Sequence, residues 1–157
     1  AGAMVEGMDR RHFSADDGGP PRPVVCAVDD DDLAPRVVET AAGFAERFDA
    51  PLTVVHSPYP DRFLTGEPYR SALEAGHAFV ERVTEGVEVD EYVVEIGPPE
   101  QLIADVADQG AALIVVGNRG RGRLETALRG SVSQAVITNA TCPVLAVSAE
   151  VAAAARA

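Results

Sequence analysis

The sequence predicts an α/β fold, in which a doubly wound, five-stranded parallel sheet has helices on both faces. Two observations predict it. Short apolar runs rich in β-branched residues alternate with longer segments of helical periodicity, which favours right-handed βαβ units with parallel strands. One run, Ala111–Gly117, is apolar throughout, as expected for a strand that is covered on both faces.

Five strands are expected, each from a short apolar or β-branched run. The first run, PVVCAVD, ends in an acid, and the second, LTVVH, ends in a histidine. The third is DEYVVEI and the last is CPVLAVS. The five predicted strands are Pro23–Asp29, Leu52–His56, Asp90–Ile96, Ala111–Gly117 and Cys142–Ser148.

The first two helices follow from apolar residues that recur at helical spacing. Leu33–Phe48 is expected to be helical, with Asp32 as its N-cap and Pro35 tolerated in the first turn. The prolines and glycine of Ser57–Pro68 predict a long loop, after which Tyr69–Val83 is expected to form the second helix.

Two further helices complete the alternation. The third is expected to open at Pro99, which pre-sets the backbone angle of a first turn, and has its apolar stripe on Leu102, Ile103 and Val106. The fourth is expected over Val132–Asn139, before the final strand.

The composition excludes some classes of partner. Twenty-five acidic residues against thirteen basic ones give a net charge of −12, which argues against a general affinity for nucleic acid or anionic membranes. All the basic residues are arginines. A salt-rich cytoplasm and a GC-rich genome are both compatible with this acidic, lysine-free composition.

The 157 residues are expected to form one domain over 23–149, with a poorly ordered leader at 1–22 and a tail at 150–157. Cys26 and Cys142 lie in different apolar runs and are interpreted as small buried hydrophobes in a reducing compartment. No run is long enough to cross a membrane and no secretory signal is evident, so a cytoplasmic location is expected.

The segment GNRGRGRLETALRGS, Gly117–Ser131, reverses the charge of the chain locally. It contains four glycines, four arginines and one glutamate, for a local charge of about +3. Glycines allow successive backbone N–H groups to turn inward and form a cradle for an anion. The segment leaves the carboxyl end of the fourth strand, where doubly wound sheets bind their ligands.

The start of the next helix adds to this cradle. Ser131 and Gln134 have the S-x-x-Q spacing of a capping box, which predicts Ser131 as the N-cap. The free amides of Val132 and Ser133 would then face outward from a positive helix terminus, which favours phosphate.

The spacing Gly117-x₂-Gly120-x₉-Gly130-Ser131 resembles that of the universal stress protein family, in its ATP-binding branch. The resemblance covers about residues 23–149. It implies a nucleotide-binding three-layer sandwich of the α-hydrolase-like kind, with ATP as its ligand, with or without Mg²⁺. It also implies a homodimer formed through the C-terminal strand, Val144–Ser148.

The resemblance further implies a role for individual residues. Asp29 would contact the sugar or adenine side of the nucleotide, and the backbone of Ser57 would line the adenine pocket. Gly117 and Gly120 would pass close to the ribose and phosphates, so a valine at Gly117 or Gly130 is expected to block binding without disturbing the fold. The implied nucleotide-binding residues are Ala27, Asp29, Ser57, Val116, Gly117, Arg119, Gly120, Gly130, Ser131, Val132 and Ser133. No catalytic or metal-ligating residue is assigned.

The run of four acids, Asp29–Asp32, departs from the family pattern and has three readings. The acids cap and complement the dipole of the next helix, they help to position Mg²⁺, or they weaken triphosphate binding. His56 is expected to be a hydrogen-bonded pocket wall rather than a catalytic base. The loop Ser57–Pro68, with Tyr59 and Phe63, is either a lid over the adenine or a surface connection.

Three functions remain open from the sequence. The leading hypothesis is a nucleotide-dependent, homodimeric regulatory module without fast catalysis. The second is a slow ATPase or an autophosphorylating protein, with Ser131 or Ser133 as acceptor. The third is a nucleotide-free dimerisation or scaffold protein of the same family.

Overall fold

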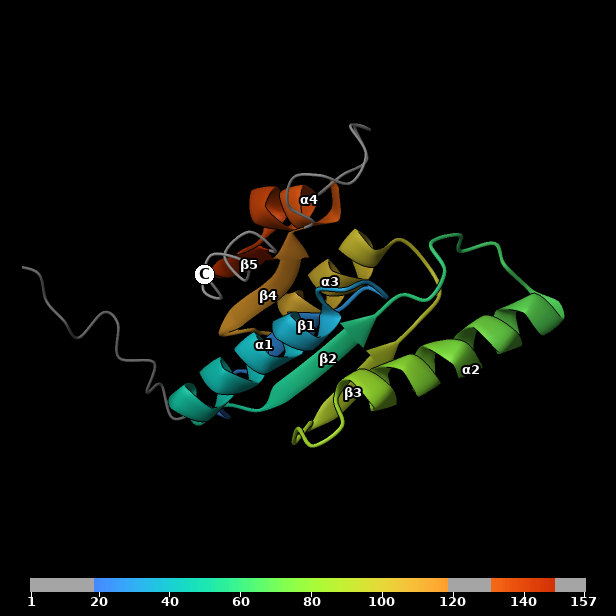
Figure 1. Ribbon diagram of the computed structural model, residues 1–157. Coiled ribbons are helices and arrows are strands. Elements are labelled where there is room, and N and C mark those ends of the chain that lie inside the picture. Colours follow the sequence, from blue (N-terminus) through green and yellow to red (C-terminus); the bar gives the residue numbers. More distant parts are fainter. Residues whose placement is uncertain (1–18, 119–130, 149–157) are drawn as a thin grey trace, which may run out of the picture.

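The computed structural model describes residues 19–118 and 131–148 (Figure 1). Within these ranges, five strands and four helices alternate along the chain and form a three-layer sandwich, which confirms the predicted fold class. The elements are β1 (Val24–Ala27), α1 (Ala34–Phe48), β2 (Leu52–His56), α2 (Gly66–Val83), β3 (Glu91–Val94), α3 (Pro99–Asp108), β4 (Leu113–Asn118), α4 (Ser131–Asn139) and β5 (Val144–Ser148).

The sheet has the strand order β3-β2-β1-β4-β5, and every pair is parallel. The chain therefore steps from β1 outward to β3, returns to the other side of β1 at β4 and steps outward again to β5. The direction reverses between β1 and β4, whose register pairs Val24 with Leu113 and Ala27 with Val116. In doubly wound sheets, ligands bind beyond the carboxyl ends of the strands at this switch point.

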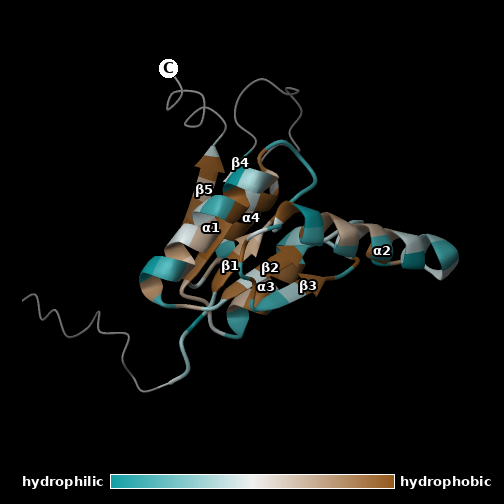
Figure 2. Ribbon diagram, turned by 60° about the horizontal axis from the view of Figure 1, so that its bottom comes forward, coloured by the Kyte–Doolittle hydropathy of each residue, from teal (hydrophilic) through white to brown (hydrophobic). Residues whose placement is uncertain are grey.

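Two hydrophobic clusters fill the space between the layers. Helices α1 and α2 cover one face of the sheet, and α3 and α4 cover the other (Figure 1). Side chains alternate between the two faces, so Leu113 and Val115 contact the first cluster while Ile114 and Val116 contact the second. This double burial explains why the β4 segment is apolar without interruption. Figure 2 shows mostly hydrophobic strands, with helices around them in which hydrophobic and hydrophilic residues alternate.

Some element boundaries differ from the predicted ones. Helix α2 begins at Gly66 and not at Tyr69, because Pro68 falls within its first turn, where a missing N–H removes no helical hydrogen bond. Helix α3 begins at Pro99, as predicted. The first and third strands are shorter than their apolar runs, β1 ending at Ala27 and β3 at Val94.

Gly76 lets α2 pack closely on the rest of the fold. A Cβ atom built on Gly76 would lie 2.9 Å from Cγ of Pro58 and 2.9 Å from Cγ1 of Val94. A proline ring and a buried, branched side chain have little freedom to move away. Gly43, in the middle of α1, offers a matched comparison, because a Cβ there meets nothing within 4 Å.

We expect Gly76→Ala to destabilise the protein and Gly43→Ala to leave it unchanged or more stable. Overpacking costs about 1–3 kcal/mol, whereas replacing glycine by alanine in a helix contributes roughly 1 kcal/mol in favour of folding. Urea unfolding followed by circular dichroism would measure both variants. Equal unfolding midpoints for the two would contradict the close packing inferred at Gly76.

Candidate functional site

The carboxyl ends of β1 and β4 bring two predicted site residues side by side. Ala27 and Val116 are partners in the parallel ladder. Val116 is buried, and its side chain belongs to the cluster beneath α3 and α4. Ala27 is half-buried at the same edge. What these two residues can offer a ligand is therefore main chain, with small or inward-pointing side chains that leave room for it.

Gly117 opens the glycine-rich segment and is also part of the sheet. It lies inside β4, paired with Val147 of β5, and is not among the glycines of positive φ. A Cβ added here would lie 3.3 Å from Cγ2 of Val37 and 3.7 Å from Cδ1 of Leu33. The side that glycine leaves open therefore faces α1. A valine at Gly117 would therefore place its side chain against α1, where Val37 must move by a few tenths of an ångström to accept it. The effect of Gly117→Val on the fold stays a prediction.

Asp29 begins a tight turn directly after β1. Its Oδ1 accepts the N–H of Asp30 at 2.9 Å, and its carbonyl accepts the N–H of Asp31 at 2.9 Å. The preceding residue, Val28, still donates its N–H to the carbonyl of Val55 at 3.0 Å. The exposed Asp29 thus stands at the first position where the chain leaves the sheet.

His56 closes β2 beside this turn. It is buried, and its Nδ1 lies 2.9 Å from the carbonyl oxygen of Val28. Its ring packs against Phe79 of α2, with the centroids 4.6 Å apart. The hydrogen bond and the burial agree with the structural role that the sequence suggested for this residue.

The acidic run forms a turn directly before α1, and the N-cap is one residue later than predicted. The N-cap position is Leu33, and it is Asp31 whose Oδ1 accepts the N–H of Leu33 at 2.9 Å. Asp32 as the N-cap was therefore wrong by one residue, and no side chain at the N-cap position caps the helix. Within residues 19–118 and 131–148, no three His, Cys, Asp or Glu side chains are grouped to hold a metal ion.

We expect Asp31→Ala to lower the free energy of unfolding by about 0.5–1.5 kcal/mol, the usual net contribution of one hydrogen bond, because the N–H of Leu33 would lose its acceptor. Asp31→Asn keeps an oxygen in the place of Oδ1 and is expected to retain most of the stability. Urea unfolding at pH 7 compares the two variants. If asparagine were as destabilising as alanine, charge and not the hydrogen bond would be the cause.

Helix α4 begins at Ser131, so it includes the residue that the capping-box pattern placed just before it. Because β5 runs parallel to β4, α4 runs back along the sheet, and its amino end lies at the carboxyl edge of the strands. Val132 packs against the cluster beneath α3 and α4, and Ser133 is 5% exposed. Arg119, Gly120 and Gly130 lie outside the described residues.

Ser57 fastens the loop after β2 to the turn after β3. Its Oγ donates to the carbonyl of Gly97 at 2.5 Å and also lies 3.2 Å from the carbonyl of Tyr59. Gly97, at φ +146°, donates its N–H to the carbonyl of Tyr59 at 2.9 Å. The side chain of Ser57 is thus engaged within the protein, which leaves its main chain as the part able to meet a ligand. Phe63, farther along this loop, is 81% exposed.

Sequence reasoning missed this contribution of Gly97. The local signal was present, since a glycine before two prolines is a strong mark of a turn. What the sequence did not indicate is that this turn would meet the loop after β2, because the two segments are 40 residues apart and come together only through the pairing of β2 with β3.

The two cysteine thiols differ from the groups at this edge in being poorly reactive. Burial raises the pKa of the Cys26 thiol to about 12, and it also raises the pKa of the half-buried Cys142. Thiols held in the protonated form are poor nucleophiles and poor metal ligands. Cys26 is buried as expected, whereas Cys142 is only partly so.

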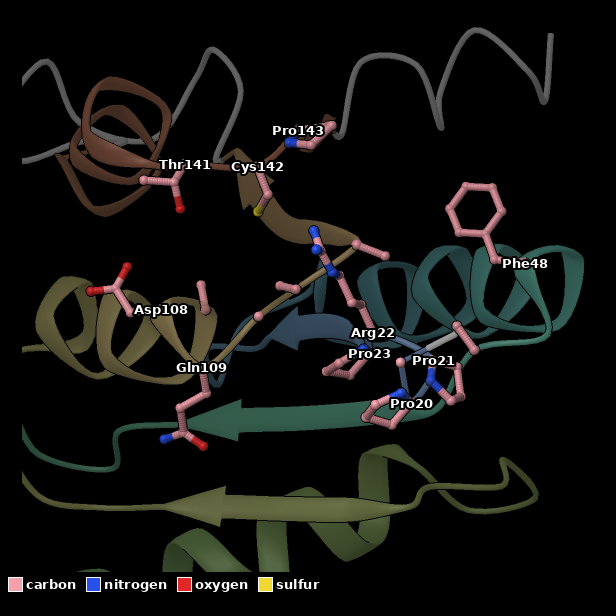
Figure 3. Close-up of a pocket in the computed structure, with 16 residues that line it drawn as sticks. Pro20, Pro21, Arg22, Pro23, Phe48, Asp108, Gln109, Thr141, Cys142 and Pro143 are labelled. Carbon is pink, nitrogen blue, oxygen red and sulfur yellow. The ribbon is translucent and has the colours of Figure 1, made fainter. Parts of the chain in front are cut away.

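A cavity of about 1070 Å³ lies at the opposite edge of the sheet, where the strands begin (Figure 3). Its wall includes Arg22, Phe48, Asp108 and Cys142, and Figure 3 shows Arg22 pointing toward Cys142. The cavity is separate from the switch point, so it does not take part in the candidate site.

No helix in the described part of the chain is long and apolar enough to cross a membrane.

Comparison with known proteins agrees with this architecture. The model of the universal stress protein family matches residues 21–148, and the chain belongs to that family. It is 34% identical over 132 residues to a Thermus aquaticus universal stress protein encoded in the QAH/OAS sulfhydrylase 3′ region, covering 79% of this chain and 96% of the relative.

Two solved structures of the family contain nucleotides. One is the universal stress protein of Archaeoglobus fulgidus in complex with dAMP, with a TM-score of 0.55 and 30% identity over 80% of this chain and 96% of the other. The second is a universal stress protein in complex with cAMP, with a TM-score of 0.58 and 26% identity over 83% of this chain and 98% of the other. The chain is therefore similar to proteins that bind adenine nucleotides.

Proposed function

We propose that this protein binds ATP at the switch point between β1 and β4 and acts as a nucleotide-dependent regulatory module in the cytoplasm. The observation that carries the proposal is the coincidence of two independent features. The strand order reverses at the edge where β4 ends, and the chain that follows β4 has the G-x₂-G-x₉-G-S spacing. The dAMP and cAMP complexes of two relatives support an adenine nucleotide as the ligand.

The proposed contacts fall into groups that face different parts of the nucleotide. Asp29 and the main chain of Ala27 and Ser57 would face the sugar and adenine. Val116 and Gly117 would border the ribose through their main chain. The remaining proposed contacts, which would hold the phosphates, are Arg119, Gly120, Gly130, Ser131, Val132 and Ser133.

Electrostatics explains how so acidic a protein would hold a polyphosphate. The helix dipole at the start of α4 would contribute about 0.3–1 kcal/mol at an exposed site, and up to about 2 kcal/mol when partly buried. Four arginines between β4 and α4 would add direct attraction in a chain whose net charge is −12. The same net charge disfavours nucleic acid as a partner. Mg²⁺ would reach the site together with the phosphates.

Binding without fast chemistry is the preferred form of the proposal. The histidine near the site, His56, uses Nδ1 to hold Val28 and is buried against Phe79. Ser133, one of the two serines considered as phosphate acceptors, is 5% exposed, which makes it a poor acceptor. A slow ATPase, autophosphorylation at Ser131 and a nucleotide-free scaffold remain the alternatives.

Isothermal titration calorimetry with ATP and Mg²⁺ tests the proposal directly. We expect Gly130→Val to weaken binding at least about a hundredfold, or roughly 2.7 kcal/mol, because Cβ bulk would occupy the approach to the phosphates. Gly19→Val is the matched control, since a Cβ at Gly19 meets nothing within 4 Å and should leave affinity unchanged.

The same samples, incubated with γ-labelled ATP, separate binding from catalysis. Release or transfer of label above background, lost in Gly130→Val, would favour the ATPase or autophosphorylation alternative. Absence of any ATP binding by the unsubstituted protein would favour the scaffold.

We also propose that the protein forms a homodimer through β5. This strand lies at the edge of the sheet, and its apolar residues Val144, Leu145 and Ala146 are only half-buried in the single chain. The N–H of Ile114 donates to the carbonyl of Pro143, which sets the ladder so that the amide of Ala146 points away from β4. An open edge of this kind invites pairing with a second copy.

Ala146→Pro tests the dimer with little effect on the fold. Proline removes an N–H that points away from β4 and is tolerated on edge strands. We expect sedimentation equilibrium to show a dimer for the unsubstituted protein and for Ala146→Ser, and a monomer for Ala146→Pro with an unchanged circular dichroism spectrum. A proline variant that stays dimeric would place the interface elsewhere.

A further inference from the structure

The carbonyl of Val28 receives its hydrogen bond from a side chain two elements away in the sequence. Nδ1 of His56 lies 2.9 Å from this oxygen, and the bond is buried. The N–H of Val28 is also held, by the carbonyl of Val55 at 3.0 Å. Both polar groups of Val28 are therefore fixed by consecutive residues of β2, one residue beyond the end of β1.

The geometry defines the state of the imidazole. A carbonyl oxygen only accepts hydrogen bonds, so Nδ1 of His56 must carry the hydrogen. The ring is held by Phe79 of α2 at 4.6 Å and an interplanar angle of 50°, and the guanidinium carbon of Arg82 lies 5.7 Å from the centre of the Phe79 ring. The donor is thus oriented by packing, as well as by its hydrogen bond.

Packing alone does not explain a histidine at this place. The four preceding residues of β2 are buried, and three of them are leucine or valine. A polar ring that is 4% exposed is disfavoured unless its hydrogen bonds are satisfied. Compared with another valine, histidine adds an N–H donor. This donor reaches beyond the end of the β1 ladder and fixes the chain where it enters the turn at Asp29.

We propose that His56 is a positioning residue of the nucleotide site. By holding the carbonyl of Val28, it sets where the chain leaves the sheet and so holds Asp29 toward the sugar and adenine side of the nucleotide. This inference rests on the proposed function. His56 acts through Val28 and Asp29, and it does not itself contact the ligand.

The decisive comparison is His56→Asn with His56→Leu. These two side chains have nearly the same branched shape, but only asparagine carries an N–H donor in the place of Nδ1. We expect His56→Leu to weaken ATP binding at least tenfold by calorimetry and His56→Asn to recover affinity to within about threefold of the unsubstituted protein. In the ligand-free protein, the amide NMR resonances of Val28–Asp31 should shift in the leucine variant and return in the asparagine variant.

Val80→Ala controls for a general loss of stability. Val80 is 1% exposed in the same cluster beneath α1 and α2, and it contributes nothing to the bonds of Val28. The Val80→Ala variant should lower the urea concentration at the midpoint of unfolding, and its affinity for ATP should stay within twofold of that of the unsubstituted protein. If His56→Leu does not fold, His56→Gln replaces it, because its amide corresponds to Nε2 and not to Nδ1.

The outcomes separate the two proposals. If the unsubstituted protein binds ATP and His56→Leu binds equally well, the positioning role is wrong and the proposed function stands. A failure of asparagine to recover affinity, or an equal loss in Val80→Ala, overturns the positioning role as well. If the unsubstituted protein does not bind ATP, both proposals fall together.

Discussion

The parallel pairing of β1 with β4 is the constraint on which the rest of the structure depends. β1 is hydrogen-bonded to β2 on one side and to β4 on the other, so the first half of the chain builds one side of the sheet and the second half builds the other. Helices from the two halves must then cover opposite faces, because right-handed crossovers in opposite directions place them there. The same reversal leaves the carboxyl ends of β1 and β4 without a crossing helix between them.

Side chains at this edge point into the core, and this determines what the edge can do. Val116 belongs to the cluster beneath α3 and α4, and the open side of Gly117 faces α1. A ligand at such an edge meets amides and carbonyls, which suits a phosphate or the polar rim of a base. In the proposed site, charge would come from elsewhere, from the arginines that follow Asn118 in an otherwise acidic chain. Shape and charge would then be supplied by different segments of the protein.

Long-range hydrogen bonds tie the loops of the carboxyl edge to the sheet. His56 is hydrogen-bonded to the carbonyl of Val28, and Ser57 to the carbonyl of Gly97. The last residue of β2 and the residue directly after it thus fasten the turns that follow β1 and β3. Loops near functional sites are commonly positioned by a rigid scaffold in this way. Here β2 provides it, since it lies between the two strands whose loops it fastens.

The sequence by itself determined the fold class, the type of every described element, the start of α3 at Pro99 and the membership of the family. These depend on local periodicity, on proline and glycine chemistry and on the spacing of a motif, all of which are written in consecutive residues. Only the tertiary structure decided that Asp31 accepts the N–H of Leu33 before α1, that the open side of Gly117 faces a helix, and that a Cβ atom at Gly76 has no room. Each of those depends on the direction of one bond relative to atoms that are distant in the chain or one turn away. Such directions are set by how whole elements pack, which local pattern does not specify.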